Sequence, residues 1–157
     1  TTFRVFLPAS ATRARASTPP FDPAALRASL RGTVLLVDDE EMLRRTGCKI
    51  LERLGYTVYE AKDGDEALAL LEQRGASVQL VLTDVSMPNT GGIALREAAS
   101  ARYPHLKWIL ASGYSPGSPD LGELSAGGVA MLTKPYGIAE LAQAVRRELD
   151  GVPEKAS

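Results

Sequence analysis

The chain has little of what secreted and membrane-spanning proteins require. It contains one cysteine, Cys48, in 157 residues, so no intrachain disulfide can form, and this fits a reducing compartment. No apolar run approaches the ~20 residues that span a bilayer, and the N-terminus lacks the basic start and continuous apolar core of a signal peptide. We therefore expect a soluble, cytoplasmic chain that makes no contact with a membrane.

An excess of charge of one sign is also missing. The 18 basic and 19 acidic residues leave a formal net charge of -1, which does not favour binding to nucleic acid or another polyanion. The balance is uneven, because residues 1–31 contain five arginines and one aspartate, which leaves 13 basic and 18 acidic residues in 32–157. The chain therefore changes character near residue 32.

The N-terminal part lacks the regular apolar pattern of a folded domain. Residues 1–7 alternate apolar and polar side chains as a strand does, but one short strand is not stable alone. Residues 8–31 contain four prolines among Ala, Ser, Thr and Arg, a composition typical of a linker. We expect a remnant of an upstream domain at 1–9, a linker at 10–31, one folded domain at 32–150 and a C-terminal tail at 151–157.

Five apolar runs of strand length follow the linker. They are continuous rather than alternating, as expected for strands covered on both faces. They lie at Thr33–Val37, Thr57–Ala61, Leu80–Thr83, Trp108–Ala111 and Val129–Leu132. Apolar side chains at helical spacing predict helices at 42–54, 67–71, 93–101 and 138–149, and a run rich in Gly, Pro and Ser predicts a short or irregular helix within 116–127. This alternation indicates the α/β class, with a five-stranded, doubly wound parallel sheet.

Polar side chains stand where the predicted strands end. Asp38 and Asp39 follow the first strand, and Asp84 follows the third. Ser112 ends the fourth strand, and Lys134 follows the fifth. In doubly wound sheets the functional crevice lies beyond the carboxyl ends of the strands, where the strand order reverses. We therefore expect these side chains at one edge of the sheet.

The chemistry of this set is that of a cation and a phosphoryl group. Three carboxylates in one crevice repel one another unless a cation lies between them, and oxygen ligands with open positions suit Mg²⁺. A carboxylate can also attack phosphorus and form an acyl phosphate, a transfer that needs alignment and charge neutralisation. The Lys134 ammonium and the Ser112 hydroxyl suit that neutralisation. Taken singly, each residue also fits a structural role; acids after a strand favour a helix N-terminus, for example.

Four short motifs at these strand ends together resemble the receiver domain of response regulators, which includes the chemotaxis regulators. The motifs are Val37-Asp38-Asp39-Glu40, Asp84-Val85-Ser86-Met87-Pro88 with Gly92 beyond it, Ser112-Gly113 and Lys134-Pro135. The resemblance covers about residues 32–150. It implies a flavodoxin-like (βα)5 fold and a role in two-component signal transduction by phosphorelay.

The resemblance also implies roles for single residues. The implied phosphoacceptor is Asp84, and the implied Mg²⁺ ligands are Asp38, Asp39, Asp84 and the backbone carbonyl of Ser86. The implied switch hydroxyl is Ser112, and the implied partner of the phosphoacceptor and its phosphoryl group is Lys134. The Lys134–Pro135 peptide is often cis in this family.

Met131 departs from the family pattern. The family usually has Tyr or Phe three residues before the lysine, where this chain has Met131. The usual coupling between the switch hydroxyl and an aromatic ring is therefore left open for this chain.

Residues 1–9 (TTFRVFLPA) resemble the final strand of the ATPase domain of histidine kinases. This implies the C-terminal receiver of a hybrid sensor histidine kinase. Its partners would be a phosphohistidine of its own or a partner chain, or a histidine phosphotransfer protein. The isolated domain would be no enzyme beyond its own aspartyl phosphorylation and dephosphorylation.

Three other function classes fit the sequence less well. A phosphatase of the haloacid-dehalogenase type has Asp-x-Asp at its nucleophile, whereas Asp84 is followed by Val85 and Ser86, and the chain leaves little room for a cap. A dinucleotide-binding module needs a Gly-rich turn after the first strand, where this chain has acids. An interaction module without chemistry would not need the full set of acids.

Overall fold

The computed structural model describes residues 32–113 and 128–151. The expectations for residues 1–31, for the helix within 116–127 and for most of the C-terminal tail lie outside the described residues. The described elements are β1 (Thr33–Val37), α2 (Glu41–Arg53), β2 (Thr57–Ala61), α3 (Gly64–Arg74), β3 (Leu80–Asp84), α4 (Gly92–Ser100), β4 (Lys107–Gly113), β5 (Ala130–Lys134) and α6 (Ile138–Asp150).

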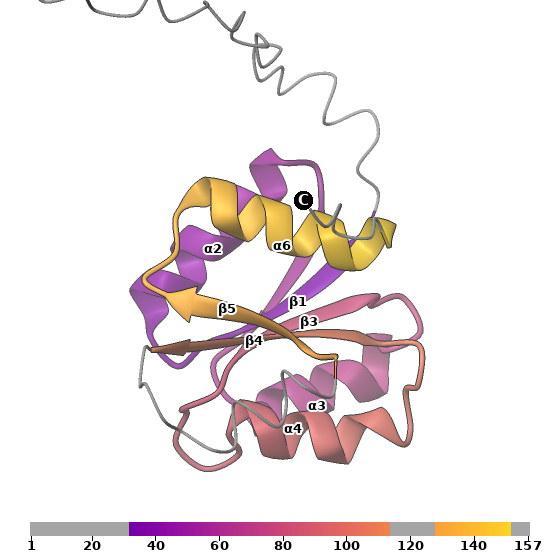
Figure 1. Cartoon of the computed structure of the whole chain (residues 1–157). Helices are drawn as coiled ribbons and strands as arrows, with labels where there is room; N and C mark the ends of the chain where they lie inside the picture. Colours follow the sequence, from indigo (N-terminus) through magenta and orange to yellow (C-terminus); the bar gives the residue numbers. More distant parts are fainter. Residues whose placement is uncertain (1–31, 114–127, 152–157) are drawn as a thin grey trace, which may run out of the picture.

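The five strands form one parallel sheet in the order β2-β1-β3-β4-β5. The helices α2 and α6 lie on one face of the sheet and α3 and α4 on the other (Figure 1). The strand order reverses at β1, which lies between β2 and β3, so the chain leaves the neighbouring strands β1 and β3 toward opposite faces of the sheet. This is the doubly wound, flavodoxin-like fold predicted from the sequence, and the prediction is confirmed.

Two separate cores explain the continuous apolar runs. Along β1, Val34 and Leu36 pack in the core under α2 and α6, while Leu35 and Val37 pack in the core over α3 and α4. Successive side chains of a strand point to opposite faces, so a strand covered on both sides needs an apolar residue at every position. Each face is therefore sealed by two helices among the described elements.

Strand ends depart from the apolar pattern. The pattern predicts the bounds of β1 and β2, but β3, β4 and β5 continue one or two residues past their predicted ends. The pairs Asp84↔Ala111, Ser112↔Thr133 and Gly113↔Lys134 extend the ladder through polar residues. Backbone groups make the ladder, so a polar side chain does not end it. The candidate site residues are therefore anchored on the sheet or directly beside it.

Two helix starts use acidic side chains as caps. The Asp63 carboxylate accepts a hydrogen bond of 2.8 Å from the backbone N–H of Glu66 at the start of α3. The Glu140 carboxylate accepts one of 2.6 Å from the N–H of Gly137 before α6. Such contacts satisfy backbone donors that lack partners within the helix.

Within residues 32–113 and 128–151, no helix has the length and apolar character needed to cross a membrane.

We expect the substitution Leu82→Ala to lower the free energy of unfolding by about 3 kcal/mol. Leu82 is buried at the centre of β3 between two neighbouring strands, so the truncation leaves a cavity that the sheet cannot fill. The measurement is urea denaturation followed by circular dichroism. Met42→Ala, at an exposed position on α2, is the control and should change the same quantity by less than about 0.5 kcal/mol. Equal losses in the two variants would contradict the core described above.

Candidate functional site

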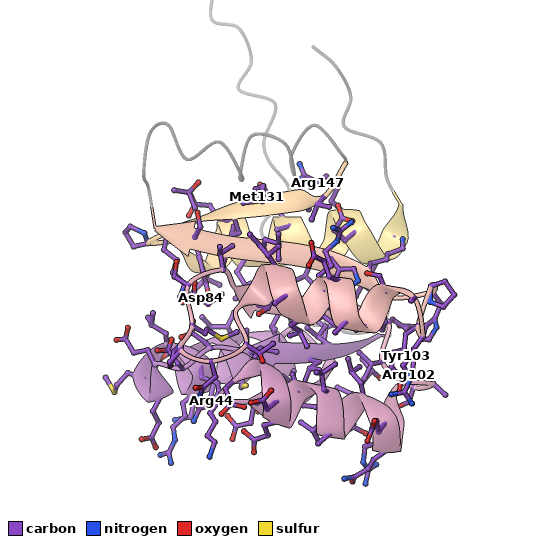
Figure 2. All side chains as sticks on the ribbon, turned by 90° about the horizontal axis from the view of Figure 1, so that it is seen from below. Arg44, Asp84, Arg102, Tyr103, Met131 and Arg147 are labelled. Carbon is purple, nitrogen blue, oxygen red and sulfur yellow. The ribbon has the colours of Figure 1, made fainter. Side chains whose placement is uncertain are left out.

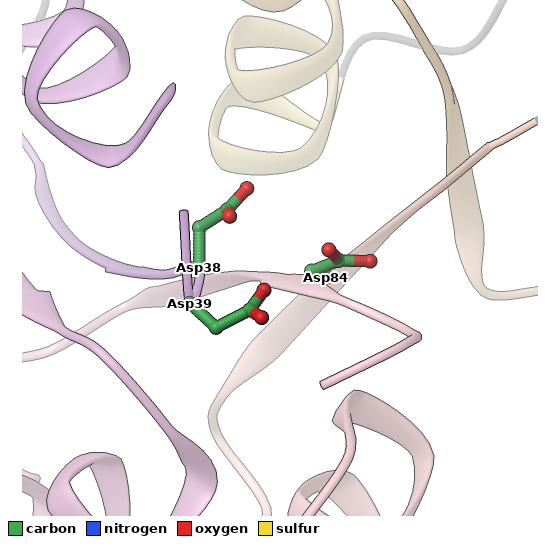
Figure 3. Close-up of side chains that lie close together, drawn as sticks. All are labelled: Asp38, Asp39 and Asp84. Atoms are coloured by element: carbon green, nitrogen blue, oxygen red, sulfur yellow. The ribbon is translucent and has the colours of Figure 1, made fainter. Parts of the chain in front are cut away.

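Three carboxylates meet at the point where the strand order reverses. Asp38 and Asp39 follow β1, and Asp84 is the last residue of β3 (Figure 3). One carboxylate oxygen of each lies within 4.8 Å of the others. Asp38 and Asp84 are buried, whereas Asp39 is exposed. The acids predicted to converge do converge, on one rim of the sheet.

Lys134 joins two of these acids. Its Nζ lies 2.7 Å from Oδ2 of Asp38 and 2.8 Å from Oδ2 of Asp84. The side chains of Lys134, Asp38 and Asp84 are 16%, 3% and 11% exposed, so water screens these contacts poorly. Burial by itself lowers the pKa of Lys134, but the hydrogen bonds and charges of Asp38 and Asp84 outweigh it, and the pKa lies above its ordinary value. The lysine is therefore an ammonium at neutral pH.

Asp38 has a partner at each of its polar groups. Its backbone N–H donates to the carbonyl of Ala61 at 3.2 Å, and its own carbonyl accepts from the guanidinium of Arg44 at 2.8 Å. Its Oδ1 accepts from the backbone N–H of Glu40 at 2.9 Å, and its Oδ2 contacts Lys134. A buried carboxylate needs such partners, because an unsatisfied one costs several kcal/mol. Both the backbone and the side chain of Asp38 are thus fixed in direction.

Asp84 is held in a similar way. Its Oδ1 accepts a hydrogen bond of 3.0 Å from the backbone N–H of Ser86, while its Oδ2 contacts Lys134. Its backbone carbonyl faces Gly92 at the start of α4, where an added Cβ would lie only 2.4 Å from that oxygen. Gly92 therefore permits α4 to begin against the backbone of Asp84, which explains its place in the sequence motif.

Two other predicted site residues are placed differently. Ser112 is half-buried at the end of β4, and its hydroxyl donates to the neighbouring carbonyl of Gly113 at 3.2 Å rather than to the acids. Ser86 contacts Asp84 through its N–H, and the role predicted for its carbonyl stays a prediction.

Met131 is half-buried on β5 opposite Leu110 of β4. The Lys134–Pro135 peptide is cis, as the resemblance implies.

The lone thiol lies outside this arrangement and is half-buried. Cys48 packs beside the core under α2, and its Sγ lies 3.8 Å from Oε2 of Glu60. Burial first, and then the charges of Glu60 and Glu52, raise the pKa of Cys48 to about 12. Since the thiolate is the reactive form, the raised pKa and the contact with the core point to a packing role for this cysteine.

One residue of the site was not anticipated from the sequence. Arg44 contacts the backbone of Asp38, although nothing in its sequence context resembles a ligand motif. A usable signal was its position in the first turn of α2, four residues after Glu40, whose carbonyl accepts the Arg44 N–H at 2.9 Å. A side chain there lies close to the loop that precedes the helix.

The donor set fits a hard divalent cation. Carboxylate oxygens from two adjacent strand ends lie within reach of one ion, and exposed Asp39 leaves the crevice open to water. Mg²⁺ is commonly bound by one or two carboxylates together with water and phosphate oxygens. The ammonium of Lys134 lies between two of the same carboxylates. Together with a bound divalent cation, it would balance the negative charge of the three acids.

Comparison with known proteins gives a consistent result. Residues 34–146 match the family model of the response regulator receiver domain. The sensor kinase CckA of Brucella abortus is 35% identical over 156 residues, a match that covers 96% of this chain. The chain spans only 16% of the length of that relative.

Solved structures show the same architecture. The receiver domain of the hybrid histidine kinase CckA is 30% identical, with a TM-score of 0.64 over 75% of this chain and 99% of that one. The chemotaxis protein CheY4 of Vibrio cholerae is 27% identical, with a TM-score of 0.67 over 76% of this chain and 99% of that one.

We expect Gly92→Ala to disturb the site through the backbone of Asp84. The new methyl group would meet the Asp84 carbonyl oxygen at 2.4 Å, so either α4 or Asp84 must shift, and the free energy of unfolding should fall by about 2 kcal/mol. Urea denaturation measures the loss, and amide NMR shifts of Asp84 and Val85 report the displacement. Gly113→Ala is the matched control, since no described atom lies within 4 Å of its added Cβ. Unmoved amide shifts in Gly92→Ala would contradict this account.

Proposed function

The chain belongs to the response regulator receiver domain family, and from this we propose that it is a phosphorelay receiver whose Asp84 accepts a phosphoryl group from a phosphohistidine. The observation that carries the proposal is the convergence of Asp38, Asp39 and Asp84 with the ammonium of Lys134. Receiver domains act in two-component signalling, so the function class is that of the family. The finer steps below are proposals.

Asp84 is the proposed nucleophile. One of its carboxylate oxygens forms the new P–O bond while the P–N bond to the donor imidazole breaks and its electron pair returns to the ring. The N–H of Ser86 and the ammonium of Lys134 each hold one oxygen of this carboxylate, so its direction is set before the phosphoryl group arrives. Such preorganisation matters because phosphoryl transfer depends mainly on alignment and charge neutralisation.

Mg²⁺ is the proposed cofactor. Asp38, Asp39, Asp84 and the backbone carbonyl of Ser86 would hold it, and the clustered carboxylate oxygens support this assignment. When bound, it supplies positive charge to the phosphoryl oxygens during transfer. Binding also relieves the repulsion among the three carboxylates.

Lys134 and Ser112 are the proposed partners of the phosphoryl group. Lys134 is already an ammonium beside Asp84, so it can follow the charge from the carboxylate onto the phosphoryl oxygens. Among the described residues, the Ser112 hydroxyl donates only to the neighbouring carbonyl of Gly113, and as a hydroxyl it can donate to a phosphoryl oxygen instead.

We further propose that the parent protein is a hybrid sensor histidine kinase in the cytoplasm. The match to the sensor kinase CckA covers 96% of the chain and so extends beyond residues 34–146 into the N-terminal segment that resembles a kinase domain. The phosphodonor or acceptor would then be a phosphohistidine of the same protein, of a partner kinase or of a histidine phosphotransfer protein. The receiver alone catalyses only its own phosphorylation and dephosphorylation.

With acetyl phosphate and Mg²⁺, we expect the chain to gain one phosphoryl adduct that is absent in Asp84→Asn. The substitution removes the nucleophilic oxygen and keeps the shape of the side chain, so the fold should persist. Intact-mass spectrometry measures the adduct. Asp150→Asn, at an exposed carboxylate on α6, is the control and should be modified as the wild type is. An adduct that persists in Asp84→Asn, or steady hydrolysis of a phosphate ester as by a phosphatase, would overturn the proposal.

In the full-length parent protein with radiolabelled ATP, we expect label on both a histidine and Asp84. Acyl phosphates are lost in base and phosphohistidine in acid, so the two pools are separated by pH treatment before counting. Asp84→Asn should abolish the base-labile pool and keep the acid-labile one. Absence of any acid-labile label would exclude the hybrid-kinase origin and leave the receiver chemistry itself intact.

A further inference from the structure

Arg44 is a largely buried arginine at the same end of the sheet as the acidic crevice. Its side chain is 15% exposed, whereas that of Arg45, the next residue of α2, is 67% exposed and pairs with Glu41. Figure 2 shows Arg44 and Asp84 toward one end of the molecule and Arg102 and Tyr103 toward the other. An arginine buried to this degree needs specific partners.

The partners of Arg44 are the backbone of Asp38 and a side chain of β2. One guanidinium nitrogen donates to the carbonyl of Asp38 at 2.8 Å, and Nε lies 3.5 Å from Oε2 of Glu60. The N–H of Asp38 donates to the carbonyl of Ala61 at the end of β2. The backbone of Asp38 is therefore tied to β2 twice, directly through its N–H and indirectly through Arg44.

This tie bears most strongly on Asp39. A peptide group is planar, so fixing the carbonyl of Asp38 also fixes the N–H of Asp39 and the direction in which its Cα leaves the peptide. Among the described residues, no hydrogen bond or ion pair holds the Asp39 carboxylate, which is exposed. Its place beside Asp38 and Asp84 thus depends on the backbone that Arg44 orients.

We propose that Arg44 is a positioning residue that aligns the Asp38–Asp39 backbone so that both carboxylates can bind the cation. The proposal rests on the Mg²⁺ site of the proposed function. Partners that orient metal ligands commonly change metal affinity by about 10- to 100-fold when removed. Arg44 would act in this way from the backbone side of the ligand.

The sign of the effect separates positioning from simple charge. A guanidinium near the crevice repels a divalent cation, so a purely electrostatic role predicts that its removal tightens Mg²⁺ binding. A positioning role predicts the opposite, because misdirected carboxylates bind the cation less well. The two accounts therefore disagree on the direction in which the Kd changes.

We expect Arg44→Gln to raise the Kd for Mg²⁺ about ten-fold. The Kd is measured by titrating each variant with Mg²⁺ and following its amide NMR signals in the absence of denaturant. Circular dichroism first establishes that each variant is folded. The amide resonance of Asp39 should also shift before any Mg²⁺ is added, because its peptide plane is no longer fixed. Arg45→Gln is the matched control: it removes the same charge one residue away and should leave the Kd unchanged or slightly lower.

Arg44→Lys keeps the charge and provides a second test. An ammonium cannot present two donors in the planar arrangement of a guanidinium, so it loses part of the contact to Asp38 and Glu60. We expect a Kd between those of the wild type and Arg44→Gln, and this variant also serves if Arg44→Gln does not fold. A Kd equal to or below that of the wild type in the folded variants would overturn the positioning role. A wild-type chain that does not bind Mg²⁺ would instead overturn the proposed function.

Discussion

The contact of one ammonium with two buried carboxylates is the constraint on which the site depends. Lys134 lies at the end of β5, yet it contacts Asp38 after β1 and Asp84 at the end of β3. Removing Lys134 would leave both carboxylates without their counter-charge, and breaking a buried ion pair in this way commonly costs about 3–5 kcal/mol. The carboxyl rim of the sheet is therefore an electrostatic unit, in which a change at one strand end alters the charge balance at the others.

The packing around the crevice serves to hold backbone groups as much as side chains. Gly92 lets α4 start against the carbonyl of Asp84, and Arg44 ties the carbonyl of Asp38 to β2. The backbone of Asp84 is thus held by α4, the helix that follows it, and the backbone of Asp38 by Arg44 and the neighbouring strand β2. This arrangement leaves Asp39, at the front of the crevice, exposed to solvent.

The same geometry distinguishes this chain from the other function classes considered. Acids rather than glycines follow β1, so the turn cannot cradle a pyrophosphate. An interaction module without chemistry would not need three acids at one rim, because clustered carboxylates repel one another. Met131 on β5 stands at the position where the resemblance leads one to expect an aromatic residue.

Much of the fold, and most of the residues that meet at the site, could be predicted from the sequence alone, because both follow from local sequence patterns. Continuous apolar runs indicated two-sided burial, and the acids and the lysine stood at predicted strand ends. The sequence could not show that Lys134 divides its contacts between Asp38 and Asp84, which lie 96 and 50 residues away from it. Nor could it show the contact of Arg44 with Asp38 or the direction of the Ser112 hydroxyl. Those depend on strand order and side-chain direction, which arise only when the elements pack, since periodicity along the chain carries no information about distance across the sheet.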